Sequence, residues 1–280
     1  MEKSKCKAKV AALLMALVIV FIPFGSVFAA SAPGMLEVGH LGVENSGTTY
    51  EYGGTYYIAE QSHVYLTGEI SNYRSGFNLE LTVTNFETDK TIRRVKERIT
   101  PPSDMKTVDL LDLCNPSTQH GYNMLCSKEL VDAMDLRTLP EGYYRFEFMM
   151  NDNAYVQGRC VYVKVYDRTA MAFARGTYDL FDISRSGKIA YYAYELGKKR
   201  LSAKDFVWTM YVNNPNKLNN MNPRSAVINI CRFCYGGPID STQMYTYMDY
   251  ARQRGAGRLL RVILDSSRCQ RYFQDLGFKA

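Results

Sequence analysis

The sequence predicts a two-domain protein in which an all-β antiparallel sandwich precedes an all-α helical repeat domain. Apolar residues alternate with a period of two up to about residue 166 and recur with the period of a helix after Arg168. The charge changes at the same point: residues 30–168 carry a net charge of −6, whereas residues 169–280 carry 17 Lys and Arg against 8 Asp and Glu. We therefore expect a sandwich domain over 33–168 and a basic helical repeat domain over 169–280.

The composition is that of a folded protein. Hydrophobic residues make up 46% and charged residues 22% of the 280 residues, which excludes a wholly disordered chain. A chain of this length buries enough apolar surface to fold without a structural metal.

The N-terminal segment predicts a secretory signal peptide over 1–29. Four lysines precede an unbroken apolar run, Val10 to Ile22, which Pro23 ends. Small residues then predict cleavage near Ala29 or Ala32. The apolar run is short for a membrane span, although an uncleaved anchor is the alternative. We expect a secreted or cell-surface protein with no integral membrane span after cleavage.

Short strands are predicted throughout the acidic half. Alternating apolar and polar residues place one side of each strand on a core and the other in water. Turn residues such as Gly53-Gly54 and Asn151-Asp152-Asn153 separate the strands. The clearest alternating runs are Val64–Leu66, Leu79–Val83, Tyr144–Phe148 and Val161–Val165.

One motif in this half has a more specific meaning. Leu139, Gly142 and Tyr144 lead directly into an alternating strand. This spacing resembles the tyrosine corner of immunoglobulin-like and fibronectin-like sandwiches, in which the Tyr hydroxyl bonds back to the main chain. The resemblance implies an immunoglobulin-like sandwich with Tyr144 as the corner residue, although the Cys…Trp…Cys core pattern of antibody domains is absent.

The cysteines outside the signal peptide leave several pairings open. A Cys114–Cys126 bridge would close a short loop and stabilise the fold by roughly 3 kcal/mol, the alternative being two buried thiols. Cys269 is expected to bridge to Cys231 or to Cys234. The alternative is that all three cysteines are small, unpaired core residues. We expect Cys160 to be unpaired or to form an intermolecular bridge.

The sequence contains no recognisable catalytic, cofactor or metal motif. A single C-x-x-C pair, Cys231 and Cys234, lies in the half that has no histidine, because His40, His63 and His120 all precede it. H-E-x-x-H, G-x-S-x-G, P-loop and dinucleotide fingerprints are absent. We therefore expect no metal and no cofactor, and a non-catalytic protein, with a secreted hydrolase lacking a recognisable motif as one alternative.

Amphipathic helices are predicted along the basic half. Ser202 and Asp205 have the spacing of a capping box that opens one of them. Apolar residues recur at helical spacing in three sets: Ile189, Tyr192, Ala193 and Leu196; Val227, Ile230, Cys231 and Cys234; Met244, Tyr247, Met248 and Ala251.

The sequence also predicts an internal repeat of the helical segments. Segments that begin at Ile183 and Ile239 are similar to each other. The half resembles domain of unknown function 4214, a helical module often found in tandem in secreted and surface proteins of bacteria. Gly237, Ile239 and the absent Trp depart from the pattern of that family. The resemblance implies a secreted, repeat-built module without an agreed active site. The residues that match the family are Gly187, Arg232, Gly236, Asp240, Ser266 and Leu276-Gly277-Phe278.

An arginine-rich stretch supplies the candidate binding residues. Arg favours bidentate contacts with phosphate and carboxylate, so we expect the helical half to contact an anionic wall polymer or an envelope protein, and no nucleic acid. Arg254, Arg258 and Arg261 are predicted to share one helix face. The alternative for these arginines is a solvated surface. An alternative function is a carbohydrate-binding module that uses the tyrosines of the sandwich. The candidate residues are Arg252, Arg254, Arg258, Arg261, Arg268 and Arg271.

Overall fold

The structure is a computed structural model that describes residues 36–44, 47–101, 103, 106–110, 126–153 and 155–280. The predicted signal peptide lies outside the described residues, as do Cys114 and His120. Leu36–Ala280 forms one compact unit. The expectation that its two halves fold separately stays a prediction.

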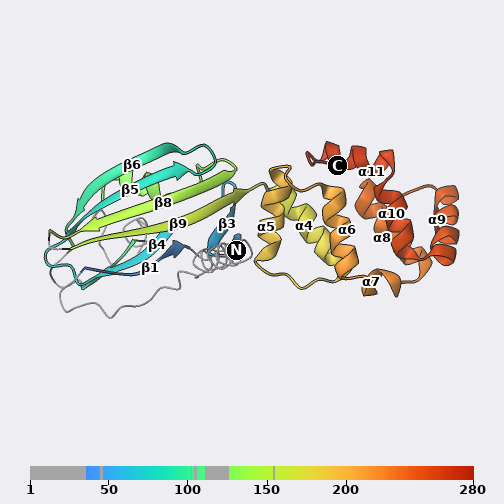
Figure 1. Ribbon diagram of the computed structural model, residues 1–280, viewed down its shortest axis with the longest axis horizontal. Helices are drawn as coiled ribbons and strands as arrows, with labels where there is room; N and C mark the ends of the chain where they lie inside the picture. Colours follow the sequence, from blue (N-terminus) through green and yellow to red (C-terminus); the bar gives the residue numbers. More distant parts are fainter. Residues whose placement is uncertain (1–35, 45–46, 102, 104–105, 111–125, 154) are drawn as a thin grey trace, which may run out of the picture. The chain divides into compact units, whose positions relative to one another are not determined.

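The strands of the N-terminal half form a small sheet and a large sheet. The small sheet has the order β1-β4-β7 and the large sheet the order β2-β3-β9-β8-β5-β6 (Figure 1). The strands of the described residues are β1 (Glu37–Val43), β2 (Thr49–Tyr52), β3 (Thr55–Ala59), β4 (Leu66–Ser71), β5 (Phe77–Asn85), β6 (Lys90–Ile99), β7 (Thr107–Asp109), β8 (Gly142–Asn151) and β9 (Val156–Tyr166).

The predicted fold class, an all-β antiparallel immunoglobulin-like sandwich followed by an all-α domain, is wrong. The large sheet is mixed, because β3 runs parallel to β9 with Tyr56 opposite Val163, and helix α3 (Lys128–Met134) lies within the β half. Alternation shows which side chains face the core but is the same for both strand directions, so it could not reveal the parallel pair. The chain has mixed α and β content, with strands in its N-terminal half and helices in its C-terminal half.

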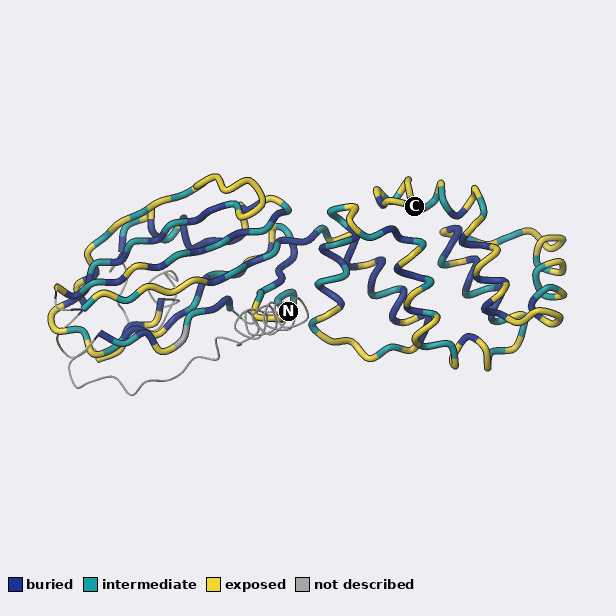
Figure 2. The backbone as a smooth tube through the Cα atoms, viewed as in Figure 1, coloured by how far each residue is buried: buried dark blue, intermediate teal, exposed yellow. Residues whose placement is uncertain are grey.

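The two sheets share one apolar core. Leu66 and Ile70 of the small sheet and Leu81 and Phe146 of the large sheet are fully buried in the same cluster. Buried and half-buried residues alternate along β5 and β8 (Figure 2). The tyrosine-corner bond is present in this half: Tyr144 is buried, and its hydroxyl donates to the carbonyl of Pro140 at 2.9 Å.

Helices follow the last strand almost directly. Asp167 alone separates β9 from α4, and its carboxylate caps that helix by accepting from the N–H of Ala170 at 2.8 Å. Ser202 caps α6 through the N–H of Asp205 at 3.0 Å, as the capping box predicts. The helices after α3 are α4 (Arg168–Phe181), α5 (Lys188–Gly197), α6 (Ala203–Asn213), α7 (Asn216–Asn219), α8 (Pro223–Tyr235), α9 (Ser241–Arg254), α10 (Ala256–Leu264) and α11 (Ser267–Asp275).

A second core joins the helices to the large sheet. It includes Tyr57, Ala59 and Tyr166 from β3 and β9 together with the buried faces of the helices. The chain end closes on the same core, because the N–H of Ala203 donates to the carbonyl of Lys279 at 2.7 Å. No helix in the described part of the chain is long and apolar enough to cross a membrane.

Candidate functional site

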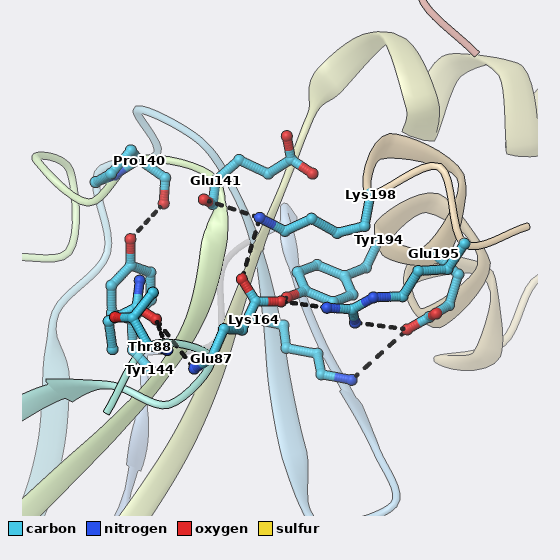
Figure 3. Close-up of polar contacts among 11 residues, drawn as sticks. Glu87, Thr88, Pro140, Glu141, Tyr144, Lys164, Tyr194, Glu195 and Lys198 are labelled. Atoms are coloured by element: carbon cyan, nitrogen blue, oxygen red, sulfur yellow. Dashed lines mark hydrogen bonds and ion pairs between the residues drawn. The ribbon is translucent and has the colours of Figure 1, made fainter. Parts of the chain in front are cut away.

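A cluster of polar side chains lies where α5 meets the large sheet, a region that we call the junction (Figure 3). Glu87 is in the turn between β5 and β6, and Asn85 shapes that turn by accepting from the N–H groups of Glu87 and Thr88. The carboxylate of Glu87 accepts from the Tyr194 hydroxyl of α5 at 2.8 Å and from the Arg200 guanidinium at 2.5 Å. The ammonium of Lys198 lies 3.3 Å from the other oxygen of the Glu87 carboxylate.

These contacts hold Glu87 in its ionised form. Burial by itself would raise the pKa of Glu87, but the hydrogen bonds from Tyr194 and Arg200 and the charge of Lys198 outweigh burial and lower it. Burial raises the pKa of Tyr194, and its hydrogen bond to Glu87 raises it further, so the hydroxyl remains a donor. The pair is therefore a stable charge-assisted hydrogen bond at neutral pH.

Lys164 of β9 occupies an aromatic cage beside this cluster. Its ammonium lies 4.8 Å from the ring centroid of Tyr194 and 5.0 Å from that of Tyr143, with Tyr57 and Tyr191 within 6 Å as well. The carboxylate of Glu195 lies 3.9 Å from the ammonium of Lys164. Burial lowers the pKa of Lys164 against the opposing effect of Glu195.

Glu141 is a second carboxylate at the junction, in a much less favourable position. Its Oε1 atom is buried and has no hydrogen-bond partner, and burial raises the pKa of Glu141 even though the charge of Lys198 lowers it. Gly197 lies against this oxygen, since a Cβ atom there would be 2.8 Å from Oε1. The backbone carbonyl of Glu141 still accepts from Lys198 at 3.3 Å.

The contacts at the junction hold α5 against the large sheet. Glu87 is bound by three donors and Lys164 is enclosed by rings, whereas Glu141 has a buried oxygen without a hydrogen-bond partner. Over the described residues, no three His, Cys, Asp or Glu side chains are placed to hold a metal ion. Sequence reasoning missed this cluster because Glu87 and Tyr194 are separated by 107 positions along the chain.

The structure distributes the six candidate arginines over three helices. Arg252 and Arg254 end α9, Arg258 and Arg261 lie on α10, and Arg268 and Arg271 lie on α11. The predicted single helix carrying Arg254, Arg258 and Arg261 is wrong, because the chain breaks at Gly255, which has a φ of +86°. Of these three arginines, only Arg258 and Arg261 share a helix.

Four of these arginines already have partners within the protein. Arg252 pairs with Asp249 at 2.9 Å. Arg261 stacks on Trp208 and pairs with Asp265, and Arg268 stacks on the ring of Tyr235, 4.4 Å from its centroid.

The fourth is Arg271, whose Nε–H donates to the carbonyl of Ser267 at 3.4 Å. Arg254 and Arg258 are exposed and make no hydrogen bond or ion pair to any described residue. We call Arg254 and Arg258 the free arginine pair.

The described cysteines include no disulfide at bonding distance. Cys231, Cys234 and Cys269 are free, buried thiols in the helical core, and the thiol of Cys234 is within hydrogen-bonding reach of Cys269. Burial raises the pKa of Cys231 to about 12, so this thiol is not a thiolate nucleophile at neutral pH. Cys160 is free and exposed.

Burial, aided by Glu97, raises the pKa of Cys126 to about 11. Its predicted partner, Cys114, lies outside the described residues, so that bridge stays a prediction.

Three aromatic rings form a patch on the outer side of the large sheet. Phe86 is 45% exposed and packs on Tyr143 at 4.8 Å and on Tyr162 at 5.9 Å between ring centroids. The guanidinium of Arg145 lies over Phe86 and pairs with Glu147 at 3.2 Å. The planes are tilted by 48° to 89° relative to one another.

No protein-family model matches the chain, and no curated protein matches it. The likeness to domain of unknown function 4214 therefore stays a prediction.

Proposed function

We propose that this chain is a non-catalytic secreted or cell-envelope protein whose helical half contacts an anionic wall polymer, with the β half as a spacer or recognition unit. The free arginine pair carries this proposal. Arg254 and Arg258 lie on either side of the turn at Gly255 and are exposed without an internal counter-charge. Their guanidinium groups are therefore available for phosphate or carboxylate groups of a ligand.

The other arginines contribute charge rather than free donors. Arg261 and Arg268 are stacked on aromatic rings and so keep fixed positions near the surface. The net charge of +9 over residues 169–280 attracts an extended polyanion over a range of about 8–10 Å at physiological salt. An envelope protein with an acidic surface is the other partner that this charge fits.

The contacts at the junction support the spacer role. Glu87, Tyr194 and Arg200 hold the first helices on the large sheet, so a polymer bound by the helices is held at a defined position relative to the sheets.

Cosedimentation of the full chain with purified cell walls tests the proposal. Arg254→Glu/Arg258→Glu should leave most of the protein in the supernatant. Arg159→Glu/Arg224→Glu is the matched control, because it makes the same change in net charge at two exposed arginines elsewhere, on β9 and α8. If both double variants lose binding equally, only total charge matters, and if neither does, the free arginine pair is not the contact.

The aromatic patch favours a second candidate function, carbohydrate binding by the sheet face. Phe86, Tyr143 and Tyr162 expose ring surface beside the polar groups of Arg145 and Glu147, and sugar rings stack on such surfaces. A glycan array probed with the full chain and with Phe86→Ala separates the two functions. Glycan binding that Phe86→Ala removes and the Arg254→Glu/Arg258→Glu change leaves intact would assign recognition to the sheet.

A further inference from the structure

A groove of about 510 Å³ lies between helices α4, α8 and α11, away from the free arginine pair and the junction. Its walls are mostly apolar, with Phe173 and Leu180 from α4, Phe233 from α8, and Tyr272 and Leu276 from α11. This volume is within the range of sites that bind small ligands.

The floor of the groove is a stripe of α4. Residues from Thr169 to Leu180 line it, a length of roughly 16 Å at the helical rise per residue. Ala172 and Gly176 are the small residues of this stripe, and the ring of Phe233 packs against Gly176, where a Cβ atom would be only 3.2 Å from it. The lining therefore follows about three turns of α4, an extent that suits a linear chain better than a compact ring system.

The charges in the lining leave one cation uncompensated. Lys217 donates to the carbonyl of Asp179 at 2.8 Å and pairs with Asp182 at 3.7 Å. The carboxylate of Asp179 pairs with Arg185 at 2.9 Å. Arg232 lines the groove, is exposed, and makes no hydrogen bond or ion pair with the described residues.

We propose that this groove binds a linear acyl carboxylate, with the alkyl chain along the α4 stripe and the carboxylate on the guanidinium of Arg232. The apolar walls from three helices would take the chain out of water, and the planar guanidinium matches a carboxylate in a bidentate pair. The charge complementarity requires one negative group per ligand, since Lys217 already pairs with Asp182 and Asp179 with Arg185. The proposal is independent of the wall-polymer function and uses different residues.

Calorimetric titration of the full chain tests this assignment. The ligands are decanoate, octanoate and decanol, each used below the concentration at which it aggregates. Decanoate should bind more tightly than octanoate, by up to about tenfold for the two added carbons. Decanol should bind more weakly than decanoate because it cannot pair with Arg232. Arg232→Gln should lower decanoate affinity by roughly tenfold and leave decanol affinity unchanged.

Variants of the floor separate the groove from the rest of the surface. Ala172→Leu should block both ligands, with Thr169→Leu as a second variant should the first not fold. Arg224→Gln, an exposed arginine of α8 outside the groove lining, is the matched control and should bind as the wild type does.

Absence of decanoate binding would overturn the proposal, as would equal binding of decanoate and decanol or an Arg232→Gln variant with full decanoate affinity. A wild-type dimer in sedimentation velocity that Ala172→Leu converts to a monomer would instead assign the groove to a second copy of the chain.

Discussion

The hydroxyl of Tyr194 donates to the carboxylate of Glu87 at 2.8 Å and so joins α5 to the turn between β5 and β6. Arg200 and Lys198, which follow α5, bind the same carboxylate. One acidic side chain in a tight turn thus receives three donors from the helical half. Because hydrogen bonds to a charged group contribute more than neutral ones, this contact is a main connection between the sheets and the helices.

Glu87→Gln should destabilise the protein by about 1–3 kcal/mol, because it removes the charge that Tyr194, Arg200 and Lys198 share. Urea unfolding at neutral pH measures the change. Asp89→Asn removes the same charge from the same turn, at an exposed position, and should have little effect. Equal losses in the two variants would contradict a specific role for Glu87.

The pH dependence of that loss follows from the lowered pKa of Glu87. A carboxylate with a lowered folded-state pKa stabilises the fold above its ordinary pKa, and this contribution disappears as the pH falls through the folded-state value. The stability difference between wild type and Glu87→Gln should therefore shrink on acidification below about pH 4. A difference that does not change between pH 7 and pH 3 would show that the ionised carboxylate is not what matters.

Glu141→Gln should have the opposite effect and stabilise the protein at neutral pH. Burial raises the pKa of Glu141, and its Oε1 atom has no hydrogen-bond partner. Because the unfolded chain releases this proton more readily, the group costs stability once the pH rises above its ordinary pKa. Thermal unfolding should show a higher melting temperature for the variant at pH 7 and none of this gain well below pH 4. A lower melting temperature at pH 7 would contradict this account.

Under oxidising conditions we expect a Cys234–Cys269 bridge, with Cys231 left as a thiol. Cys234 is within reach of Cys269, and all three side chains are buried in one core. Refolding with oxidised glutathione followed by peptide mapping identifies the pair. Cys231→Ser should form the bridge normally, whereas Cys234→Ser and Cys269→Ser should not. A Cys231–Cys269 bridge in the wild type would show that the core rearranges or that the packing differs.

The elements that depend on local pattern could be predicted, and those that depend on chain path could not. Alternation in β5 and β8 and the Ser202 cap of α6 are local signals, and the structure contains them. The parallel pairing of β3 with β9 joins segments about a hundred residues apart and leaves no mark on either strand.

The arginine site shows the same distinction within a short segment. Helical spacing predicts that Arg254, Arg258 and Arg261 share one helix face. Gly255, however, adopts a positive φ and precedes a new helix, α10. Glycine at this position was a visible signal for a break. The ring partners of Arg261 and Arg268 were not visible, because they follow from tertiary packing. The pairing of Arg252 with Asp249 is an i,i+3 contact within α9, which spacing alone could have indicated.

The salt dependence of polyanion binding tests the central claim most directly. The full chain is titrated with polyphosphate and with polyglutamate at low and physiological salt, alongside Arg254→Glu/Arg258→Glu and the control Arg159→Glu/Arg224→Glu. The account predicts wild-type binding that weakens steeply with salt, a loss of roughly tenfold in the first variant, and near wild-type affinity in the control. Wild-type affinity in the first variant, or binding that salt does not change, would contradict the claim that the free arginine pair contacts an anionic polymer.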